Sequence, residues 1–347
     1  MPAGDVVGGS LGRMTLGSTT QSLSTSYDLA MLDLDGVVYR GADAIPGAAD
    51  ALTTARDRGL RLAYITNNAS RTAATVADKL RAMGMPDVGD DDVVTSAQAV
   101  AHLMADALPA GSAVLVVGGP GLLSPLEERG LRCVATLGES PVAVVQGFDP
   151  SVGWERLAEA SYAISSGLPW YVSNTDMTVP TARGIAPGNG SLVQAVRNAT
   201  GVEPIVAGKP ERALFDETIA RVGGTHPLMV GDRLDTDIDG AINAGIDSLA
   251  VLTGVSTLQE IADAGHGCRP TFVSADLRGL DEQHPEVALT DDRARCGDAT
   301  VVLADGVVTL ESGEPSSTAV LRAAIGLAWH LHDRSGVRAR LDGTLVA

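Results

Sequence analysis

Cysteine, positive charge and long apolar runs are all scarce in this chain of 347 residues. The three cysteines, Cys133, Cys268 and Cys296, are far apart and form no C-x-x-C pair, so the sequence indicates neither a disulfide framework nor a zinc site and fits a reducing cytoplasm. The 25 basic residues face 43 acidic ones, and this net charge of −18 argues against nucleic acid or an anionic membrane surface as a partner. No apolar run reaches the ~18 residues of a membrane-spanning helix, so membrane insertion is not expected.

The N-terminal segment also lacks the apolar region of a signal peptide, and it is rich in glycine and serine. We therefore predict that residues 1–26 form a flexible leader. The remaining chain is long enough for two or three domains with separate cores, and a content of 45% hydrophobic and 20% charged residues is ordinary for a globular protein.

The stretch from Leu29 to Val38 is the most informative part of the sequence. An unbroken apolar run predicts a strand buried on both faces, and Asp33, Asp35 and Gly36 follow it directly. Strand residues two apart point to the same side, so the two carboxylates crowd one patch. A divalent metal and a phosphate bound there would offset their repulsion. Taken alone, the stretch also fits a strand end with an acidic turn.

A second predicted strand, residues 60–65, also ends in polar groups. Thr66, Asn67 and Asn68 follow it, and helical spacing resumes from residue 71 to 83 with Ser70 as a plausible N-cap. A hydroxyl, two amides and a helix N-terminus form a suitable phosphate pocket, because free N–H groups and the helix dipole both attract anions. An asparagine-rich turn that only caps the helix remains the alternative.

Residues from about 96 to 204 contain enough strand and helix patterns for a separate α/β unit. The pair Gly119 and Gly121 follows one of these strands, but a third glycine is missing and the dinucleotide-binding fingerprint is incomplete. The segment from Asn174 to Gly190 is expected to be a functional loop, and Arg183 is its only cation.

Two further segments carry polar residues after predicted strands. Lys209 follows Gly208, as in a P-loop, but Pro210 stands where that motif requires Ser or Thr. The segment is therefore not a P-loop. The strand near residues 228–231 is followed by Asp232 and a run of acidic residues. This run imitates a calcium loop that begins at Asp235, although it lacks the bidentate Glu at the last position. The calcium loop therefore stays a weaker alternative.

Taken together, the three acidic or polar strand ends and the Gly-Lys pair between the last two resemble the haloacid dehalogenase superfamily. The branch that they resemble is the p-nitrophenyl-phosphatase group, and the likeness spans residues 27–280. It implies an α/β fold with a Rossmann-like, doubly wound parallel-sheet core formed by residues 27–98 and 205–284. It further implies that residues 99–204 are an inserted α/β C2-type cap, which is also a candidate surface for homo-oligomer formation.

The same resemblance implies the catalytic roles. Asp33 is expected to attack phosphorus and form an aspartyl-phosphate, and Asp35 to act as general acid and then general base. Mg²⁺ is the expected cofactor, held by Asp33, the backbone carbonyl of Asp35, and Asp232. A small phosphorylated metabolite is the expected partner.

The resemblance also implies which residues bind substrate. Thr66, Asn67, Asn68 and Lys209 are expected at the phosphate oxygens, where Lys209 also stabilises charge in the transition state. Asp237 is expected to orient Lys209 or a metal-bound water. The cap is expected to exclude water and contact the leaving group, with Asn174 and Arg183 as candidates.

Residues 285–347 lie outside this resemblance. A hairpin turned at Asp305-Gly306 and a helix over residues 317–332 predict a small C-terminal α+β appendage. Such an extension resembles the actinobacterial glycerol-3-phosphate phosphatases, and no acetyl-CoA-binding motif is legible in it. Glycerol 3-phosphate is thus the expected substrate, which fits the neutral polar loop from Asn174 to Gly190. Phosphoglycolate, pyridoxal phosphate and nucleotides remain alternatives, as do a phosphotransferase or mutase and a non-catalytic metal-binding sensor.

Overall fold

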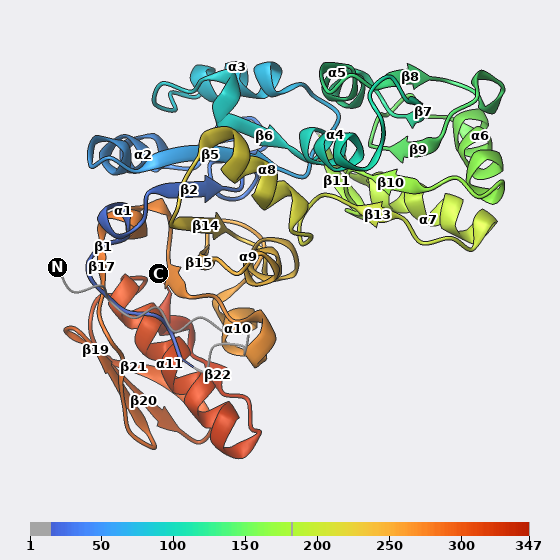
Figure 1. Ribbon diagram of the computed structural model, residues 1–347. Coiled ribbons are helices and arrows are strands. Elements are labelled where there is room, and N and C mark those ends of the chain that lie inside the picture. Colours follow the sequence, from blue (N-terminus) through green and yellow to red (C-terminus); the bar gives the residue numbers. More distant parts are fainter. Residues whose placement is uncertain (1–14, 182, 347) are drawn as a thin grey trace.

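The computed structural model describes residues 15–181 and 183–346. Within them the chain forms a core, a cap that extends from one side of it, and a C-terminal appendage that lies on another side, below the core in the view of Figure 1. None of the helices in these ranges is both long and apolar enough to cross a membrane.

The core is built on a six-stranded parallel sheet. Every residue of its central strand is buried, as the unbroken apolar run predicts. Across the sheet the strands are β16 (Phe272–Ser274), β15 (Asp247–Val251), β14 (Pro227–Gly231), β2 (Leu29–Leu32), β5 (Arg61–Thr66) and β6 (Val93–Thr95). The chain first winds from β2 outward through β5 and β6, and later from β14 outward through β15 and β16. The switch point of this doubly wound sheet therefore lies between β2 and β14, where ligands bind in such folds.

Helices cover both faces of the core sheet, as the 3.6-residue spacing of their apolar side chains requires. One face packs against α1 (Leu23–Ser26), α2 (Ala48–Asp57) and α3 (Ala73–Ala82). The other face packs against α4 (Ser96–Ala107), α8 (Ala213–Val222) and α9 (Asp239–Ala244). The core also carries α10 (Leu258–Ala262) and the short hairpin β3 (Tyr39–Arg40) with β4 (Asp43–Ala44).

The cap is a five-stranded parallel sheet with helices on both faces. Its strands in spatial order are β13 (Ile205–Val206), β10 (Trp170–Val172), β9 (Ala143–Gln146), β7 (Ala113–Val117) and β8 (Arg132–Val134). Its helices are α5 (Pro120–Glu128), α6 (Trp154–Ser165) and α7 (Asn189–Thr200). The predicted cap boundary at residue 204 is therefore wrong, because β13 completes the cap sheet.

The expected loop between Asn174 and Gly190 is also more ordered than predicted. It contains the antiparallel hairpin of β11 (Thr178–Thr181) and β12 (Gly184–Pro187), paired along their length. Sequence patterns do not reveal this hairpin, because each of its strands contains a proline and little of it is buried.

The appendage is a second, mostly antiparallel sheet that is covered by one long helix. Its apolar cluster includes the core residues Ala250 and Val273, so the appendage shares its interior with the core. Its elements are β18 (Ala288–Leu289), β19 (Arg293–Cys296), β20 (Ala299–Ala304), β21 (Val307–Ser312), α11 (Thr318–Ser335) and β22 (Arg340–Leu341). The α/β fold with a doubly wound parallel core, an α/β cap and a small appendage is as predicted.

Two predictions near the N-terminal side of the core need correction. Residues 1–14 of the expected leader lie outside the described residues, but β1 (Thr19–Ser22) pairs with β17 (Gln283–His284), and Leu23 is fully buried. The partner strand lies more than 250 residues away, so no local pattern announces it. Likewise α3 takes Thr72 as its N-cap, because the Thr72 hydroxyl accepts the backbone N–H of Thr75, and Ser70 does not cap the helix.

Candidate active site

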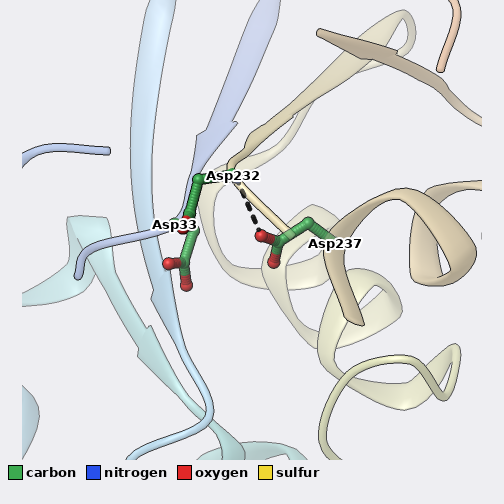
Figure 2. A group of neighbouring side chains, drawn as sticks. All are labelled: Asp33, Asp232 and Asp237. Carbon is green, nitrogen blue, oxygen red and sulfur yellow. Dashed lines mark hydrogen bonds between the residues drawn. The ribbon is translucent and has the colours of Figure 1, made fainter. Parts of the chain in front are cut away.

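The two central strands place two carboxylates side by side at the switch point of the core sheet. Leu32 of β2 is in register with Val230 of β14, and the backbone N–H of Asp33 donates to the Val230 carbonyl at 2.9 Å. Asp33 and Asp232 therefore leave the same edge of the sheet together, as Figure 2 shows. Asp237 comes from the turn that follows β14 and faces them.

These three carboxylates form a tight cluster around one lysine. One oxygen of each of Asp33, Asp232 and Asp237 lies within 4.8 Å of the others. Lys209 Nζ donates to Asp33 Oδ1 at 2.5 Å and to Asp237 Oδ1 at 2.7 Å. The side chains of Lys209, Asp232 and Asp237 are all buried, and Asp33 is half-buried. The cluster thus concentrates three potential negative charges against one positive charge.

Burial and mutual repulsion shift the protonation of the cluster. Burial raises the pKa of Asp33 to about 7 against the opposing charge of Lys209, with Asp237 and Asp232 adding to the rise. Burial and the charge of Asp237 raise the pKa of Asp232 to about 6. Burial alone would lower the pKa of Lys209, but Asp237 and Asp33 shift it upward, so the ammonium stays charged. Near neutral pH the Asp33 carboxyl is therefore only partly ionised, and a further cation at the cluster would favour the ionised form of both carboxylates.

The surroundings of Asp232 fit a metal ion. Its Oδ2 accepts the backbone N–H of Val255 at 2.7 Å, whereas its buried Oδ1 has no hydrogen-bond partner within the described chain. A Cβ added at Gly36 or Gly254 would lie 2.5 Å or 1.8 Å from Asp232 Oδ2, so the backbone wraps closely around this carboxylate. An unpaired buried carboxylate oxygen beside Asp33 is the kind of hard oxygen ligand that Mg²⁺ prefers.

Asp237 and Asp35 differ from the other two aspartates in their contacts. Asp237 Oδ2 accepts the backbone N–H groups of Asp232 and Arg233, both at 3.1 Å, while its Oδ1 holds Lys209. Asp237 is thus fully engaged, in keeping with the expected orienting role. Asp35 is exposed and its carboxylate lies outside the three-carboxylate cluster. That position suits proton exchange with a leaving group at the mouth of the site.

The calcium-loop alternative does not fit this geometry. The residues from Leu234 to Ile238 form a single π-helical turn that leads into α9. The Asp237 carboxylate points inward to Lys209, whereas Asp235 forms an ion pair with Arg233 at the surface. The carboxylates of this run therefore do not converge on one point, which a calcium loop requires.

On the phosphate side, Thr66 and Asn68 remain able to donate hydrogen bonds. Thr66 lies at the end of β5, and its Oγ1 accepts the Asn68 backbone N–H at 3.1 Å, while its own proton has no acceptor among the described residues. Asn68 is exposed, and its Oδ1 accepts from Ser70.

The structure corrects the expected role of the Asn67 side chain. Its Nδ2 donates to the Lys209 carbonyl at 3.0 Å and to Asp176 Oδ1 at 3.1 Å, which uses both donors. Its Oδ1 accepts the Lys209 backbone N–H at 2.8 Å. A phosphate oxygen can only accept hydrogen bonds, so any contact with Asn67 has to come from the backbone N–H.

The two cap residues expected at the substrate also behave differently from the prediction. Asn174 is buried, and its Nδ2 donates to the Asn67 carbonyl at 2.6 Å and to Ser173 Oγ at 3.4 Å. It therefore holds the cap loop against the core. Arg183 lies exposed at the hairpin turn, and its guanidinium has no ion pair or hydrogen bond within the described ranges. The structure does not bring it to the cluster.

Sequence reasoning missed Asp176, which reaches the site from the cap. It follows β10 by four residues and contacts Asn67 beside the phosphate pocket. Burial raises its pKa, against the influence of Asn67, Lys209 and Arg233. A carboxylate just after a buried strand is the signal that could have identified it, the same signal that marks Asp33.

A doubly wound sheet with clustered aspartates and a lysine at its switch point, closed by an inserted α/β cap, defines a C2-capped hydrolase of the haloacid dehalogenase type. The chain belongs to the haloacid dehalogenase-like hydrolases, as its sequence predicts. The model of this family matches residues 30–132, and a HAD-hydrolase-like model matches residues 206–280.

Relatives within the family are similar over most of the chain. D-glycerol 3-phosphate phosphatase of Mycobacterium tuberculosis is 42% identical over 323 residues, which is 90% of each chain. A 5′-nucleotidase of Bacillus subtilis is 39% identical over 241 residues, or 69% of this chain and 92% of its own.

Solved structures agree with these relationships. The glycerol phosphate phosphatase of Mycobacterium tuberculosis in complex with magnesium is similar with a TM-score of 0.81 and 38% identity, over 93% of this chain and 95% of its own. The 4-nitrophenylphosphatase of Thermotoga maritima is similar with a TM-score of 0.69 and 34% identity, over 75% of this chain and 98% of its own.

Proposed function

We propose that this protein is a Mg²⁺-dependent phosphomonoesterase that hydrolyses glycerol 3-phosphate to glycerol and phosphate. The observation that carries the proposal is the cluster of Asp33, Asp232 and Asp237 around Lys209 at the switch point. Such a cluster suits a reaction in which a carboxylate attacks a phosphate and the surrounding positive charge stabilises the transferring oxygens.

The residues of the chain have separate tasks in this reaction. Asp33 attacks phosphorus, the ester P–O bond breaks, and an aspartyl-phosphate forms. Asp35 gives its proton to the departing glycerol oxygen, and then takes a proton from the water that hydrolyses the aspartyl-phosphate. Lys209 and the Thr66 hydroxyl bind the phosphate oxygens, and Asp237 keeps Lys209 directed at Asp33.

Asp33, Asp232 and the backbone carbonyl of Asp35 would hold Mg²⁺. The unpaired Oδ1 of Asp232 supports this assignment. When bound, the ion supplies positive charge that reduces the repulsion between the Asp33 carboxylate and the phosphate. The raised pKa values of Asp33 and Asp232 point the same way, since a cation there would stabilise the ionised form of both carboxylates and lower both pKa values.

The choice of glycerol 3-phosphate rests on the Mycobacterium tuberculosis relative and on the cap hairpin. That relative bears the name of this activity and aligns over 90% of this chain. The hairpin strands carry two hydroxyl side chains, Thr178 and Thr181, and have no aromatic platform for a pyridine ring or a base. Its one cation, Arg183, is exposed, which gives little support to recognition of the phosphoglycolate carboxylate.

The proposal is tested by comparing kcat/KM for glycerol 3-phosphate, phosphoglycolate, pyridoxal 5′-phosphate and a nucleoside 5′-monophosphate in Mg²⁺. We expect glycerol 3-phosphate to be preferred and all activity to disappear with EDTA and return with Mg²⁺. A clear preference for the nucleotide would instead align the chain with its Bacillus subtilis relative. Glycerol release that requires an added acceptor sugar, with the phosphoryl group recovered on that sugar and not as inorganic phosphate, would indicate a phosphotransferase.

Two further expectations remain part of the proposal. The three cysteines are free thiols, which supports a cytoplasmic protein. Trp154 and Tyr162 on α6 are 75% and 58% exposed, which supports pairing of two copies through the cap. Light scattering of the wild type and of Trp154→Ala would test that pairing.

A further inference from the structure

One buried amide joins the cap to the catalytic lysine. The Asn67 side chain bonds both the N–H and the carbonyl of the Lys209 backbone, at 2.8 Å and 3.0 Å. The second N–H of the same amide goes to Asp176 Oδ1 of the cap, at 3.1 Å. Asn67 thus fixes the peptide from which the Lys209 side chain extends to Asp33.

The Lys209 peptide and the Asp176 carboxylate favour the same orientation of this amide. A carboxylate accepts hydrogen bonds and cannot donate them, so only the NH₂ of Asn67 can face it. In the opposite orientation, the Asn67 oxygen would face the Asp176 carboxylate and the Lys209 carbonyl, leaving two pairs of acceptors in contact. The buried site would then hold unpaired polar groups, which is costly. Asp176 therefore strengthens the orientation in which Asn67 binds the Lys209 backbone.

The cap loop that carries Asp176 is itself firmly held. The Asp176 backbone N–H donates to Asn174 Oδ1 at 3.1 Å, and Asn174 Nδ2 donates to the Asn67 carbonyl at 2.6 Å. A Cβ added at Gly208 would lie 2.5 Å from the Ser173 carbonyl, so the chain before Lys209 lies directly against this loop. The three segments interlock at the edge of the phosphate pocket.

We propose that Asp176 is a positioning residue, which fixes Lys209 for phosphoryl transfer by orienting the Asn67 amide. The cap then has a second task besides covering the substrate, because it completes the arrangement of a catalytic residue of the core. This inference rests on the proposed phosphatase activity for its kinetic test, but its structural consequence can be measured without turnover.

The test compares Asp176→Ala and Asp176→Asn in the full-length chain with Mg²⁺, on glycerol 3-phosphate and on 4-nitrophenyl phosphate. Asp176→Ala leaves one N–H of the buried Asn67 amide without its partner and holds Asn67 less firmly, so we expect kcat to fall about tenfold on both esters with KM changed less than about twofold. Asp176→Asn keeps an acceptor oxygen for Asn67, and we expect it to recover most of that loss. Glu155→Ala, an exposed cap carboxylate in the first turn of α6, is the matched control.

Hydrogen exchange supplies a readout that does not depend on activity. The Lys209 amide donates to Asn67 Oδ1, so it should exchange faster in Asp176→Ala than in the wild type, in Asp176→Asn and in Glu155→Ala. If Asp176→Ala fails to fold, the Asn67→Asp variant replaces it. That variant places two carboxylates together, so it should be slow, and adding Asp176→Asn should restore part of its rate and protection.

Three results would overturn the proposal. If kcat fell equally in Asp176→Asn and Asp176→Ala, the negative charge of Asp176 would matter, and not its oxygen as a hydrogen-bond acceptor for Asn67. A rise in KM confined to glycerol 3-phosphate would show that Asp176 touches the leaving group. An unchanged kcat and exchange rate in Asp176→Ala would show no positioning at all. If the wild type hydrolyses 4-nitrophenyl phosphate but not glycerol 3-phosphate, only the proposed substrate is contradicted. If the wild type shows no turnover at all, the proposed phosphatase function is contradicted. The hydrogen-exchange measurement still tests the role of Asp176 in either case.

Discussion

Two buried charge clusters in this molecule are built in opposite ways. At the switch point, Asp33, Asp232 and Asp237 face the single ammonium of Lys209. At the junction of α4, α5 and α8, the single buried carboxylate of Glu217 faces several partners. Its partners are the guanidinium of Arg129 at 2.9 Å, that of Arg221 at 3.0 Å, and the ring of His102.

The difference separates a functional cluster from a structural one. The Glu217 cluster joins the cap, through Arg129 at the end of α5, to the core, and its carboxylate oxygens are fully paired. The cluster at the switch point is short of positive charge, and Asp232 Oδ1 has no partner among the described residues. Burial without compensation costs free energy, so a cluster of this kind persists where a ligand supplies the missing charge.

The largest effect is expected from Asp33→Asn. The amide keeps the shape of the side chain but removes the nucleophile, so turnover of 4-nitrophenyl phosphate should fall by about 10⁴-fold or more. The melting temperature should not decrease, because one of three crowded carboxylates has become neutral. Steady-state kinetics and acid-quenched mass spectrometry for phosphate on residue 33 are the measurements. If the variant kept activity within roughly 100-fold of the wild type, Asp33 would not be the nucleophile.

Asp232→Asn should abolish the response of the protein to magnesium. The wild type should gain thermal stability as Mg²⁺ is added, because the ion binds only the folded site. The variant should show no such gain and should lose activity in parallel. Differential scanning fluorimetry against Mg²⁺ measures this, with Asp235→Asn, an exposed aspartate of the same segment, as the control. A magnesium-induced stabilisation that survives in Asp232→Asn would place the metal elsewhere.

The metal-free stability of the same variant should depend on pH with a defined sign. The pKa of Asp232 is raised from 3.8 to about 6, so the folded protein binds this proton more tightly than the unfolded chain. Ionising Asp232 therefore lowers the free energy of unfolding. The effect is absent below about pH 4 and reaches about 3 kcal/mol above about pH 6. In EDTA, Asp232→Asn should be more stable than the wild type at pH 8, and urea unfolding should show the difference vanish toward pH 4. A difference that grows as the pH falls would contradict this assignment.

Glu217→Ala tests the contrasting cluster. Removing the one carboxylate leaves Arg129 and Arg221 facing each other at the cap junction, and we expect a loss of about 2–4 kcal/mol of unfolding free energy. Per folded molecule, kcat should change far less than in Asp33→Asn or Asp232→Asn. Urea denaturation and active-site titration separate the two quantities. A stable variant with lost activity would show that this cluster also serves catalysis.

The smallest effect is expected from Arg183→Ala. The side chain is exposed on the hairpin and lies outside both clusters, so kcat/KM for glycerol 3-phosphate should stay within about twofold of the wild type. The same assay with phosphoglycolate is decisive for the alternative substrate. A preference for phosphoglycolate that disappears with Arg183→Ala would make this residue the carboxylate ligand and overturn the substrate choice.

The sequence by itself determined the core fold and the place of its site. Apolar runs that end in Asp33 and Asp232 indicate buried parallel strands, and the carboxyl ends of such strands meet at one edge of the sheet. The pairing of β2 with β14 then follows from the doubly wound topology, which the family resemblance implied, so the proximity of the two aspartates was predictable from that resemblance together with the local patterns. The placement of Lys209 followed from resemblance, and the structure accounts for it through Asp237.

Only the tertiary structure decided which polar side chains stay free for a substrate. Asn67 and Asn174 look like substrate ligands in the sequence. In the structure the Asn67 side chain donates to Asp176 and to the Lys209 carbonyl, and the Asn174 side chain donates to the Asn67 carbonyl. Each of these bonds spans more than 100 residues. The pairing of β1 with β17 is equally distant. Local spacing and propensity do not predict a hydrogen bond across such a separation, because polar residues of these types are also common in loops where they make no such bond. For that reason the sequence was sufficient to locate the site. Only the fold distinguished the amides that remain free to bind a substrate from those that hold the cap loop and Lys209 in place.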